Sequence, residues 1–221
     1  MARILKPSDT NMKRPLAIGL GCLLLLAVSS AGADDADKAI RMAAERVAVG
    51  TCASCHGPQG HSYSPKFPVL AGQHASYLIV QLQAFRAQTR GDADALGYMW
   101  GMSAPLDDAM MVALADYYAK QAPRAGLTEE PALLARGKDI YQSGDSGQGV
   151  PPCAPCHGPG AAGTDAFPRL AGQHREYLIK QLGSFQSNMR NVAVMHGVAL
   201  GLQRADIQAV ATYLQSLGQL P

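Results

Sequence analysis

The sequence predicts an all-α protein built from two tandem domains, and three observations support this prediction. The chain repeats itself, because FPVLAGQHASYLIVQLQAF at 67–85 and FPRLAGQHREYLIKQLGSF at 167–185 align without a gap. Apolar residues within both halves recur at helical spacing. Neither half shows an alternating apolar and polar pattern of the length that a β-strand needs. Two long parallel repeats indicate tandem domains rather than a solenoid of short repeats.

The N-terminal residues 1–33 have the features of a secretory signal. Four basic residues precede a short apolar run at 16–28, and Ala31-Gly32-Ala33 is typical of a cleavage site. The alternatives are an uncleaved N-terminal anchor or lipidation at Cys22, although the residues before Cys22 are a poor acylation context. We therefore expect export to the periplasm with cleavage after Ala33.

Charge and composition exclude a nucleic-acid-binding protein. The 221 residues include 19 basic and 17 acidic side chains, a formal charge of +2. Removal of the leader leaves 188 residues with 15 basic and 16 acidic side chains, so the basic excess belongs to the leader. The remaining charges are interspersed in both halves, and we expect no strongly polarised face.

Domain boundaries are expected where the periodic pattern stops. QAPRAGLTEEP, residues 121–131, contains the prolines, glycine and charges typical of an exposed connection. We therefore predict an N-terminal domain at 34–122, a linker at 123–131 and a C-terminal domain at 132–221.

Each half is expected to contain three main helices separated by loops rich in glycine and proline. In the first half, Leu78, Leu82 and Phe85 show the helical spacing. Each half has only about ninety residues, too few for a generous core, so a large apolar cofactor would complete it. The predicted helices are 36–49, 75–88, 106–120, 133–141, 175–188 and 202–217.

The motif C-x-x-C-H occurs in both halves, as CASCH at 52–56 and CAPCH at 153–157. Two thiols one helical turn apart can form thioethers with the vinyl groups of a haem, and the following histidine then binds the iron. The motifs therefore predict two covalently bound haem c groups. Their thioether residues are Cys52, Cys55, Cys153 and Cys156, and their proximal ligands are His56 and His157.

Three other interpretations of the cysteines compete with haem attachment. They are a thioredoxin-like redox pair, a zinc site assembled from all four cysteines, and two disulfides. A redox pair has no use for a histidine directly after both motifs, and a shared zinc site would fuse two apparent domains. The duplicated motif behind an export signal favours haem.

The repeat also selects candidates for the sixth iron ligand. Met99 and Met195 occupy equivalent places, each seven residues before the leucine that opens the predicted final helix, Leu106 or Leu202. A methionine thioether is a common distal ligand in electron-transfer haem proteins. Met102 is the main rival. The methionines without a methionine counterpart are Met102, Met110, Met111 and Met189.

Histidine ligation is the alternative at the sixth position, because His74 and His174 are also equivalent. Each opens a middle helix, where a cap or a hydrogen bond to the haem edge is the commoner role. His61 and His196 have no counterparts, and we expect them to be exposed or beside the site.

Taken together, the mature chain resembles the cytochrome c4 family. The resemblance depends on CASCH, CAPCH, the paired F-P-x-L-A-G-Q-H segments, YMWGMSAPLDD and AVMHGVALGLQRADI. It implies two tandem class I cytochrome c domains, each a small helical bundle around a covalently bound haem, with both haems near the domain interface. It also implies that the carbonyls of Pro68 and Pro168 accept a hydrogen bond from the proximal histidines.

Two features of the paired segments leave alternatives open. Gln73 and Gln173 would support the domain interface or serve at the helix entry. The Gly137-Lys138 pair of the second half has no counterpart in the first, RMAAERVAVGTC, which leaves the packing of the N-terminal helix undetermined.

The expected function is electron transfer rather than catalysis, because both axial positions of each iron would be filled by protein. We expect a soluble or peripherally membrane-associated carrier, and the resemblance implies its two partners. Its donor would be a quinol-cytochrome c oxidoreductase and its acceptor a haem-copper terminal oxidase. The alternatives are the cytochrome subunit of a periplasmic dehydrogenase, such as a sulfide-oxidising flavoprotein, and a di-haem peroxidase. A peroxidase or a haem-based gas sensor would need an open iron position.

Overall fold

The computed structural model describes residues 22–127, 130–165 and 167–218. The chain forms two compact units, residues 1–38 and 39–221. Most of the predicted leader, residues 1–21, lies outside the described residues, and so do 128–129 of the predicted linker. Helix α1 (Cys22–Val47) includes the predicted cleavage point after Ala33. Among the described helices, none combines the length and the apolar character needed to cross a membrane.

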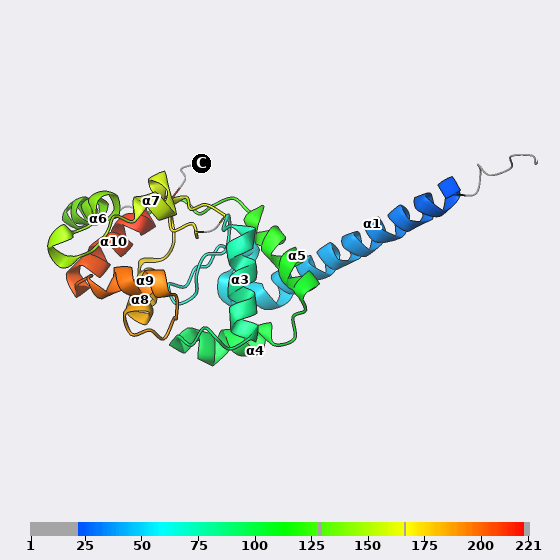
Figure 1. Cartoon of the computed structure of the whole chain (residues 1–221), viewed down its shortest axis with the longest axis horizontal. Helices are drawn as coiled ribbons and strands as arrows, with labels where there is room; N and C mark the ends of the chain where they lie inside the picture. Colours follow the sequence, from blue (N-terminus) through cyan, green and yellow to red (C-terminus); the bar gives the residue numbers. More distant parts are fainter. Residues whose placement is uncertain (1–21, 128–129, 166, 219–221) are drawn as a thin grey trace, which may run out of the picture. The chain divides into compact units, whose positions relative to one another are not determined.

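The unit at 39–221 contains the two predicted halves, each built from helices around a C-x-x-C-H motif (Figure 1). The first half includes the end of α1, the π-helix η1 (Ala48–Cys52), α2 (Ala53–His56), η2 (Pro58–Gly60), α3 (Ala75–Arg86), the π-helix η3 (Ala95–Met99), α4 (Trp100–Ser103) and α5 (Asp108–Ala119). The second half includes α6 (Pro131–Ser143), η4 (Ser146–Gln148), α7 (Ala154–His157), η5 (Pro159–Ala161), α8 (Arg175–Gln186), α9 (Ala193–Leu200) and α10 (Arg204–Ser216).

The all-α prediction is confirmed, since the described residues form helices and only isolated β-bridges. Each of the six predicted helices is present with shifted ends. Helix α5 begins at Asp108 rather than at 106, because the Asp107 carboxylate accepts a hydrogen bond from the Met110 amide and caps the helix. The prediction of loops was wrong at 95–103 and 193–200, where glycines interrupt the apolar pattern of segments that are nevertheless helical.

Each half has its own hydrophobic core. In the first half, fully buried Ala44 and Ala48 pack with Leu114, Ala115 and Tyr118. These two alanines provide the packing of the N-terminal helix that the sequence left undetermined. The core of the second half comprises Ile140, Tyr141, Val150, Ala161, Ala171, Leu178, Leu202, Ile207, Val210, Ala211 and Leu214.

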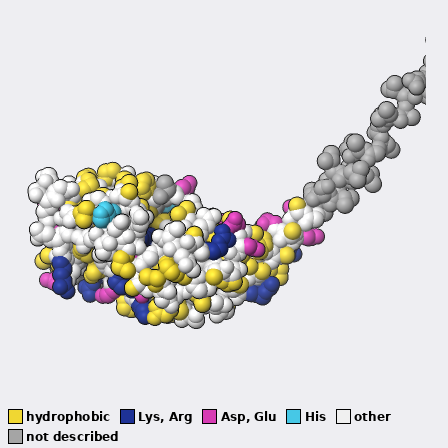
Figure 2. Space-filling model, turned by 60° about the horizontal axis from the view of Figure 1, so that its bottom comes forward, with side chains coloured by type: hydrophobic (Ala, Val, Ile, Leu, Met, Phe, Trp, Pro, Cys, Tyr) yellow, Lys and Arg dark blue, Asp and Glu magenta, His cyan; other side chains and the backbone are white. Residues whose placement is uncertain are grey.

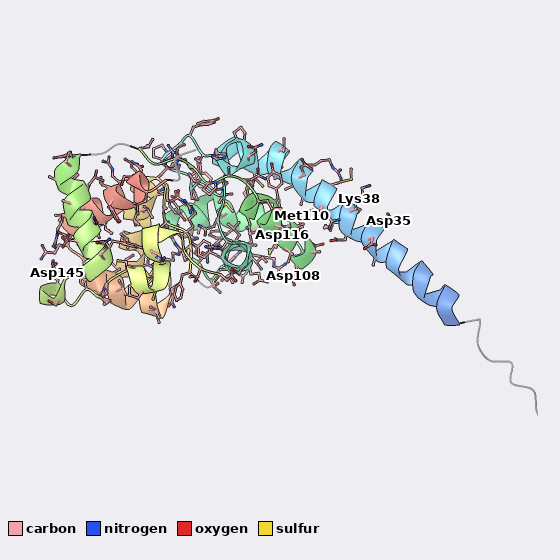
Figure 3. All side chains as sticks on the ribbon, turned by 90° about the horizontal axis from the view of Figure 1, so that it is seen from above. Asp35, Lys38, Asp108, Met110, Asp116 and Asp145 are labelled. Carbon is pink, nitrogen blue, oxygen red and sulfur yellow. The ribbon has the colours of Figure 1, made fainter. Side chains whose placement is uncertain are left out.

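Neither methionine of helix α5 lies where an iron ligand is needed. Met111 is fully buried in the protein. Met110, labelled on α5 in Figure 3, is half-buried and packs against the core of the first half. Both methionines therefore serve in packing, the usual role of methionine at helical spacing.

The surface carries charges of both signs between apolar side chains. On the face drawn in Figure 2, lysines and arginines are interspersed with acidic and hydrophobic residues, and the coloured residues form no large area of one charge. This agrees with the interspersed charges of the sequence.

Helices α6 and α10 approach closely at Gly137. A Cβ atom there would lie 2.1 Å from the Ala209 carbonyl oxygen and 2.7 Å from the Tyr213 Cβ. We predict that Gly137→Ala lowers the free energy of unfolding by about 1–3 kcal/mol, the usual cost of overpacking. A Cβ atom added at Gly183 of α8 would have no neighbouring atom within 4 Å.

Equilibrium unfolding in guanidinium chloride measures this effect, with Gly183→Ala as the matched control. The control is expected to stabilise the protein by about 0.5–1 kcal/mol, because alanine suits a helix better than glycine does. Equal changes in the free energy of unfolding for the two substitutions would contradict the close approach of α6 and α10 at Gly137.

Candidate cofactor site

A cavity of about 1070 Å³ is lined by residues of both halves of the unit at 39–221. This volume exceeds the range of about 300–1,000 Å³ typical of sites for a single small molecule. The lining is largely apolar, as a site for a large aromatic cofactor must be. The predicted site residues that line it are Cys52, Cys55, His56, Pro68, Met99, Cys153, Cys156, His157, Pro168 and Met195.

The histidine of each motif is buried and held by a backbone carbonyl. The His56 Nδ1 lies 2.9 Å from the Pro68 oxygen, and the His157 Nδ1 lies 3.1 Å from the Pro168 oxygen. A carbonyl only accepts, so Nδ1 carries the proton and Nε2 keeps its lone pair for a metal. Burial, opposed by this hydrogen bond, lowers the pKa of both histidines. The rings are therefore neutral, as metal binding requires.

The glycine after each histidine allows the chain to turn away from the motif. Gly57 has φ +73°, and a Cβ there would lie 2.2 Å from the His61 carbonyl oxygen. Gly158 also has a positive φ, +77°, which favours glycine. The sequence analysis did not identify these glycines, although both motifs continue as C-x-x-C-H-G.

The four motif cysteines are free thiols. Cys55 and Cys156 are exposed, whereas the first cysteine of each motif is half-buried. Burial raises the pKa of the Cys52 thiol and raises that of Cys153 to about 11. A thioredoxin-like pair instead lowers the pKa of its reactive thiol. Within the described ranges, no three or more metal-binding side chains gather into a cluster, so the four-cysteine zinc site does not form.

Both candidate distal methionines line the cavity. Met99 ends η3 and Met195 lies in α9, and both side chains are half-buried. The rival Met102 also lines the cavity, but 54% of its surface is exposed. The structure thus brings one equivalent methionine from each half to the cavity that holds the histidines.

The other histidines are engaged elsewhere. The His74 Nε2 lies 3.0 Å from the Ala162 oxygen, and the His174 Nε2 lies 3.0 Å from the Ser62 oxygen. Each ring therefore hydrogen-bonds the loop that follows the C-x-x-C-H motif of the opposite half. Neither histidine lines the cavity. The His196 Nδ1 lies 2.7 Å from the Phe185 oxygen, and His61 is half-buried.

Gln73 and Gln173 join the two halves reciprocally. The Gln73 side chain accepts from the Arg169 amide at 2.8 Å and donates to its carbonyl at 2.9 Å. Gln173 makes the same pair of bonds with Val69, at 2.9 and 3.0 Å. Each glutamine oxygen also accepts from the amide of the following histidine. The two roles that the sequence left open, interface and helix entry, are thus both present.

A buried polar network lies beside the cavity at the same interface. Arg90 donates to Gln81, to Tyr177 and to Gln181, while its Nε pairs with Asp92 at 2.6 Å. Although burial opposes it, the Arg90 guanidinium holds the pKa of Asp92 below its ordinary value. The carboxylate is therefore charged at neutral pH.

Arg190 mirrors Arg90 in the second half. It donates to Gln181, to Tyr77 and to Gln81, and it stacks over the Phe185 ring as Arg90 does over Phe85. The sequence analysis missed this network. Its arginines, tyrosines and glutamines recur at an offset of 100, so a comparison of polar positions between the halves could have identified them.

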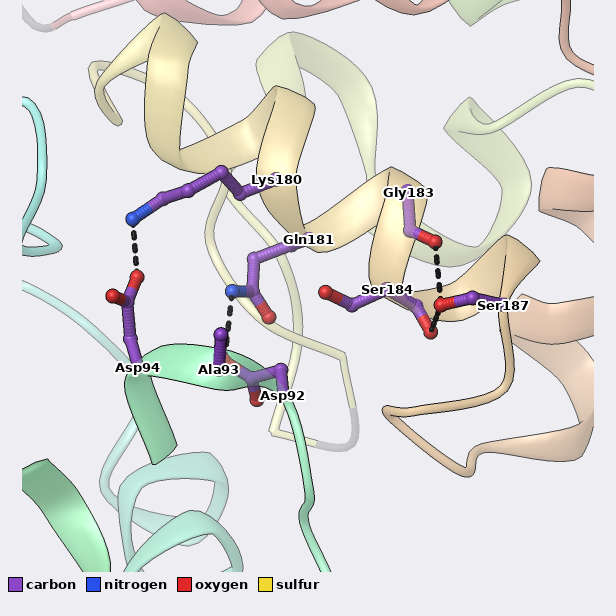
Figure 4. A pocket seen from close by; sticks show the side chains of 8 residues that line it. All are labelled: Asp92, Ala93, Asp94, Lys180, Gln181, Gly183, Ser184 and Ser187. Atoms are coloured by element: carbon purple, nitrogen blue, oxygen red, sulfur yellow. Dashed lines mark hydrogen bonds and ion pairs between the residues drawn. The ribbon is translucent and has the colours of Figure 1, made fainter. Parts of the chain in front are cut away.

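A second set of polar contacts crosses the interface at its edge. Figure 4 shows the Lys180 ammonium directed at the Asp94 carboxylate and the Gln181 amide directed at Asp92. These residues line a small pocket of about 190 Å³. The ion pair between Lys180 and Asp94 is partly exposed and adds little to stability by itself.

Comparison with known proteins identifies the family. The cytochrome c family profile matches residues 42–121 and 134–218. Cytochrome c4 of Stutzerimonas stutzeri is 39% identical over 76% of this chain and 85% of its own. The thiosulfate dehydrogenase electron acceptor of Thiomonas intermedia is 36% identical over 92% of this chain and 90% of its own. The solved structure of Acidithiobacillus ferrooxidans cytochrome c4 has a TM-score of 0.71 at 38% identity, covering 75% of this chain and 98% of that one.

The chain belongs to the cytochrome c4 family. It therefore has two cytochrome c domains, binds two haem c groups covalently and transfers electrons without being an enzyme. The site fits these groups: a large apolar cavity presents paired free thiols and two neutral histidines with a fixed tautomer.

Linker residue Arg124 makes the contact of His174 sensitive to pH in this cytochrome c4. The Arg124 guanidinium lies 2.9 Å from the His174 Nδ1, which accepts only while the ring is neutral. Burial, and secondly Arg124, lower the pKa of His174. A histidine with a folded pKa below the unfolded value of about 6.5 stabilises the fold in full above that pH. This stabilisation is lost as the pH falls below about 6.5 toward the folded pKa.

We predict that the free energy of unfolding falls over this range in the wild type and less steeply in His174→Gln. Unfolding titrations at successive pH values measure both slopes, and His61→Gln is the control. A slope unchanged by His174→Gln would contradict the assignment.

Proposed function

We propose that this cytochrome c4 is an exported periplasmic electron carrier with His–Met ligation at both irons. The proposed ligands are His56 and Met99 in the N-terminal domain, 34–122, and His157 and Met195 in the C-terminal domain, 132–221. The supporting observation is that the duplicated halves bring equivalent histidines and methionines to one cavity. When bound, the haem supplies the one-electron ferrous–ferric couple.

The protein's own residues prepare this cavity for electron transfer. The Pro68 and Pro168 carbonyls orient the histidine rings and increase their donor strength. Met99 and Met195 would each supply a thioether as the second protein ligand of an iron, which would favour the reduced iron and leave no ligand position for a substrate. The reciprocal glutamine bonds hold the two halves together without charge.

Leucine substitutions at three methionines test the ligand assignment. The oxidised wild type is expected to contain two haems and a near-infrared band from thioether-to-iron charge transfer. Met99→Leu and Met195→Leu are each expected to remove about half of this band, since each removes one of two equivalent ligands. Met102→Leu, the matched control, should leave the band unchanged.

Absorption spectra with haem quantitation provide the measurement. Carbon monoxide binding to the reduced wild type would instead show an open iron position and favour a peroxidase or a sensor. Loss of half the band in Met102→Leu would transfer the ligand role from Met99 to Met102.

The proposed partners are a quinol-cytochrome c oxidoreductase as donor and a haem-copper terminal oxidase as acceptor. A periplasmic dehydrogenase is the second candidate donor. Similarity to the Thiomonas protein, named as the electron acceptor of thiosulfate dehydrogenase, favours a sulfur-compound dehydrogenase in that role. Peripheral association with the membrane would bring the carrier close to the membrane-bound partners.

Stopped-flow reduction of the oxidised protein distinguishes the donors. We predict a second-order rate constant of about 10⁵–10⁷ M⁻¹ s⁻¹ with the physiological donor, the usual range without strong steering. The interspersed surface charges predict a weak dependence on ionic strength. Thiosulfate dehydrogenase with thiosulfate, and the quinol complex with quinol, are compared at equal concentration. Fast reduction by the dehydrogenase alone would overturn the quinol assignment while leaving the carrier function intact.

A further inference from the structure

The buried charges at the domain interface do not balance. Arg90 and Arg190 are each 7% exposed and Asp92 is 2% exposed. Arg90 pairs with Asp92, whereas the hydrogen bonds of Arg190 reach only the neutral side chains of Gln181, Tyr77 and Gln81. The Asp92 carboxylate also interacts electrostatically with Arg190, but a single carboxylate offsets only one of the two buried guanidinium charges. Because the protein interior solvates charge poorly, the remaining positive charge favours a second anion beside Arg190.

The duplication shows where this asymmetry comes from. Asp92 lies two residues after Arg90, and Val192 lies two residues after Arg190. Both occupy the same backbone place, because each carbonyl accepts from the amide four residues on, that of Leu96 or His196. The second half thus has valine where the first half has the carboxylate.

The Nε of Arg190 lacks the side-chain partner that the Nε of Arg90 has. The Arg90 Nε donates to Asp92 in its own half. The Arg190 Nε is buried and has no hydrogen-bond partner within the described part of the chain. Both arginines line the cofactor cavity, so this unpaired donor lies at the wall of the site. A buried charged donor there indicates an anionic group of the bound cofactor.

We propose that the Arg190 Nε binds a carboxylate of the haem attached to Cys153 and Cys156. This proposal rests on the haem assignment and adds to it a residue that holds the cofactor's carboxylate. The propionates are the anionic side chains of haem, and a guanidinium is well suited to bind a carboxylate. In the N-terminal domain, the corresponding Nε of Arg90 donates its hydrogen bond to Asp92. The two haem sites are therefore electrostatically unequal, although their proposed axial ligands are the same.

Lysine substitution at the two arginines distinguishes a hydrogen bond from the Nε atom from the effect of the positive charge alone. Arg190→Lys keeps the charge and loses the Nε donor. Protein carrying haem with isotope-labelled propionate carboxyl carbons is studied by infrared difference spectroscopy between the oxidised and reduced states. Arg190→Lys is expected to shift the labelled carboxylate bands of one haem. Arg90→Lys, at the equivalent position, is expected to leave them unchanged, because Asp92 holds that Nε. Equal shifts in the two variants, or no shift in Arg190→Lys, would overturn the proposal.

Substitution at Val192 tests the same contact without removing an arginine. Val192→Asp introduces the carboxylate of the first half, and 43% of the Val192 surface is exposed, so the site accommodates a polar side chain. The new carboxylate is expected to compete for Arg190, to shift the labelled bands of one haem and to lower that haem's reduction potential. Asp92→Asn is expected to raise the potential of the other haem. Arg204→Gln, which removes an exposed charge of the same half, should change neither bands nor potentials.

Two further outcomes distinguish the source of the anion. If chloride or phosphate from solution bound Arg190, the potential of one haem would shift as the concentration of that salt rose at constant ionic strength, which would overturn the proposal. Independence from the anion, together with the Val192→Asp band shift, would support the propionate. Variants are compared only after both haems and the wild-type methionine band are present, so loss of the haem site itself is recognised separately.

Discussion

The rest of the structure depends on a cavity that the protein's own side chains do not fill. Each half is too short to bury a generous apolar core, and its helices instead surround a shared apolar volume. Covalent attachment at the paired cysteines makes a cofactor part of that core. The histidines are buried and neutral, with their tautomer fixed by proline carbonyls, so little reorganisation is needed when they bind iron.

The duplication explains how two small domains become one compact unit. Gln73 and Gln173 each satisfy a backbone amide and a backbone carbonyl of the opposite half. His74 and His174 each reach the opposite half's motif loop. Because the same residues act in both directions, one set of substitutions in an ancestral repeat could create both sides of the interface. Buried reciprocal bonds of this kind fix the relative placement of the halves, since leaving any one unpaired is costly.

Sequence reasoning predicted the fold class, the six main helices and the haem chemistry, because helical spacing and the C-x-x-C-H motif are local signals. It missed the helices at 95–103 and 193–200, where glycines interrupt the periodicity. It also missed Arg90, Arg190 and their tyrosine and glutamine partners. The importance of these residues depends on the burial of polar side chains between the two halves, which no local pattern reports. The repeat contained the missing signal, because polar residues shared by both halves mark the interface as well as the ligands.

Departures from the repeat indicate where the two sites differ in function. At the edge of the cavity, Lys66 donates to Tyr98 at 2.7 Å and lies over the Tyr98 ring. In the second half, the residue before Met195 is exposed Val194, so this cation–aromatic pair is confined to the N-terminal site. At the interface, the first half likewise has a charged residue, Asp92, where the second half has the apolar Val192. A nearby cation stabilises the reduced iron and a nearby carboxylate stabilises the oxidised iron, because reduction lowers the positive charge of the haem. Equivalent ligands in unequal fields are sufficient to give the two haems different potentials, and such a difference would give electron flow between the domains a preferred direction.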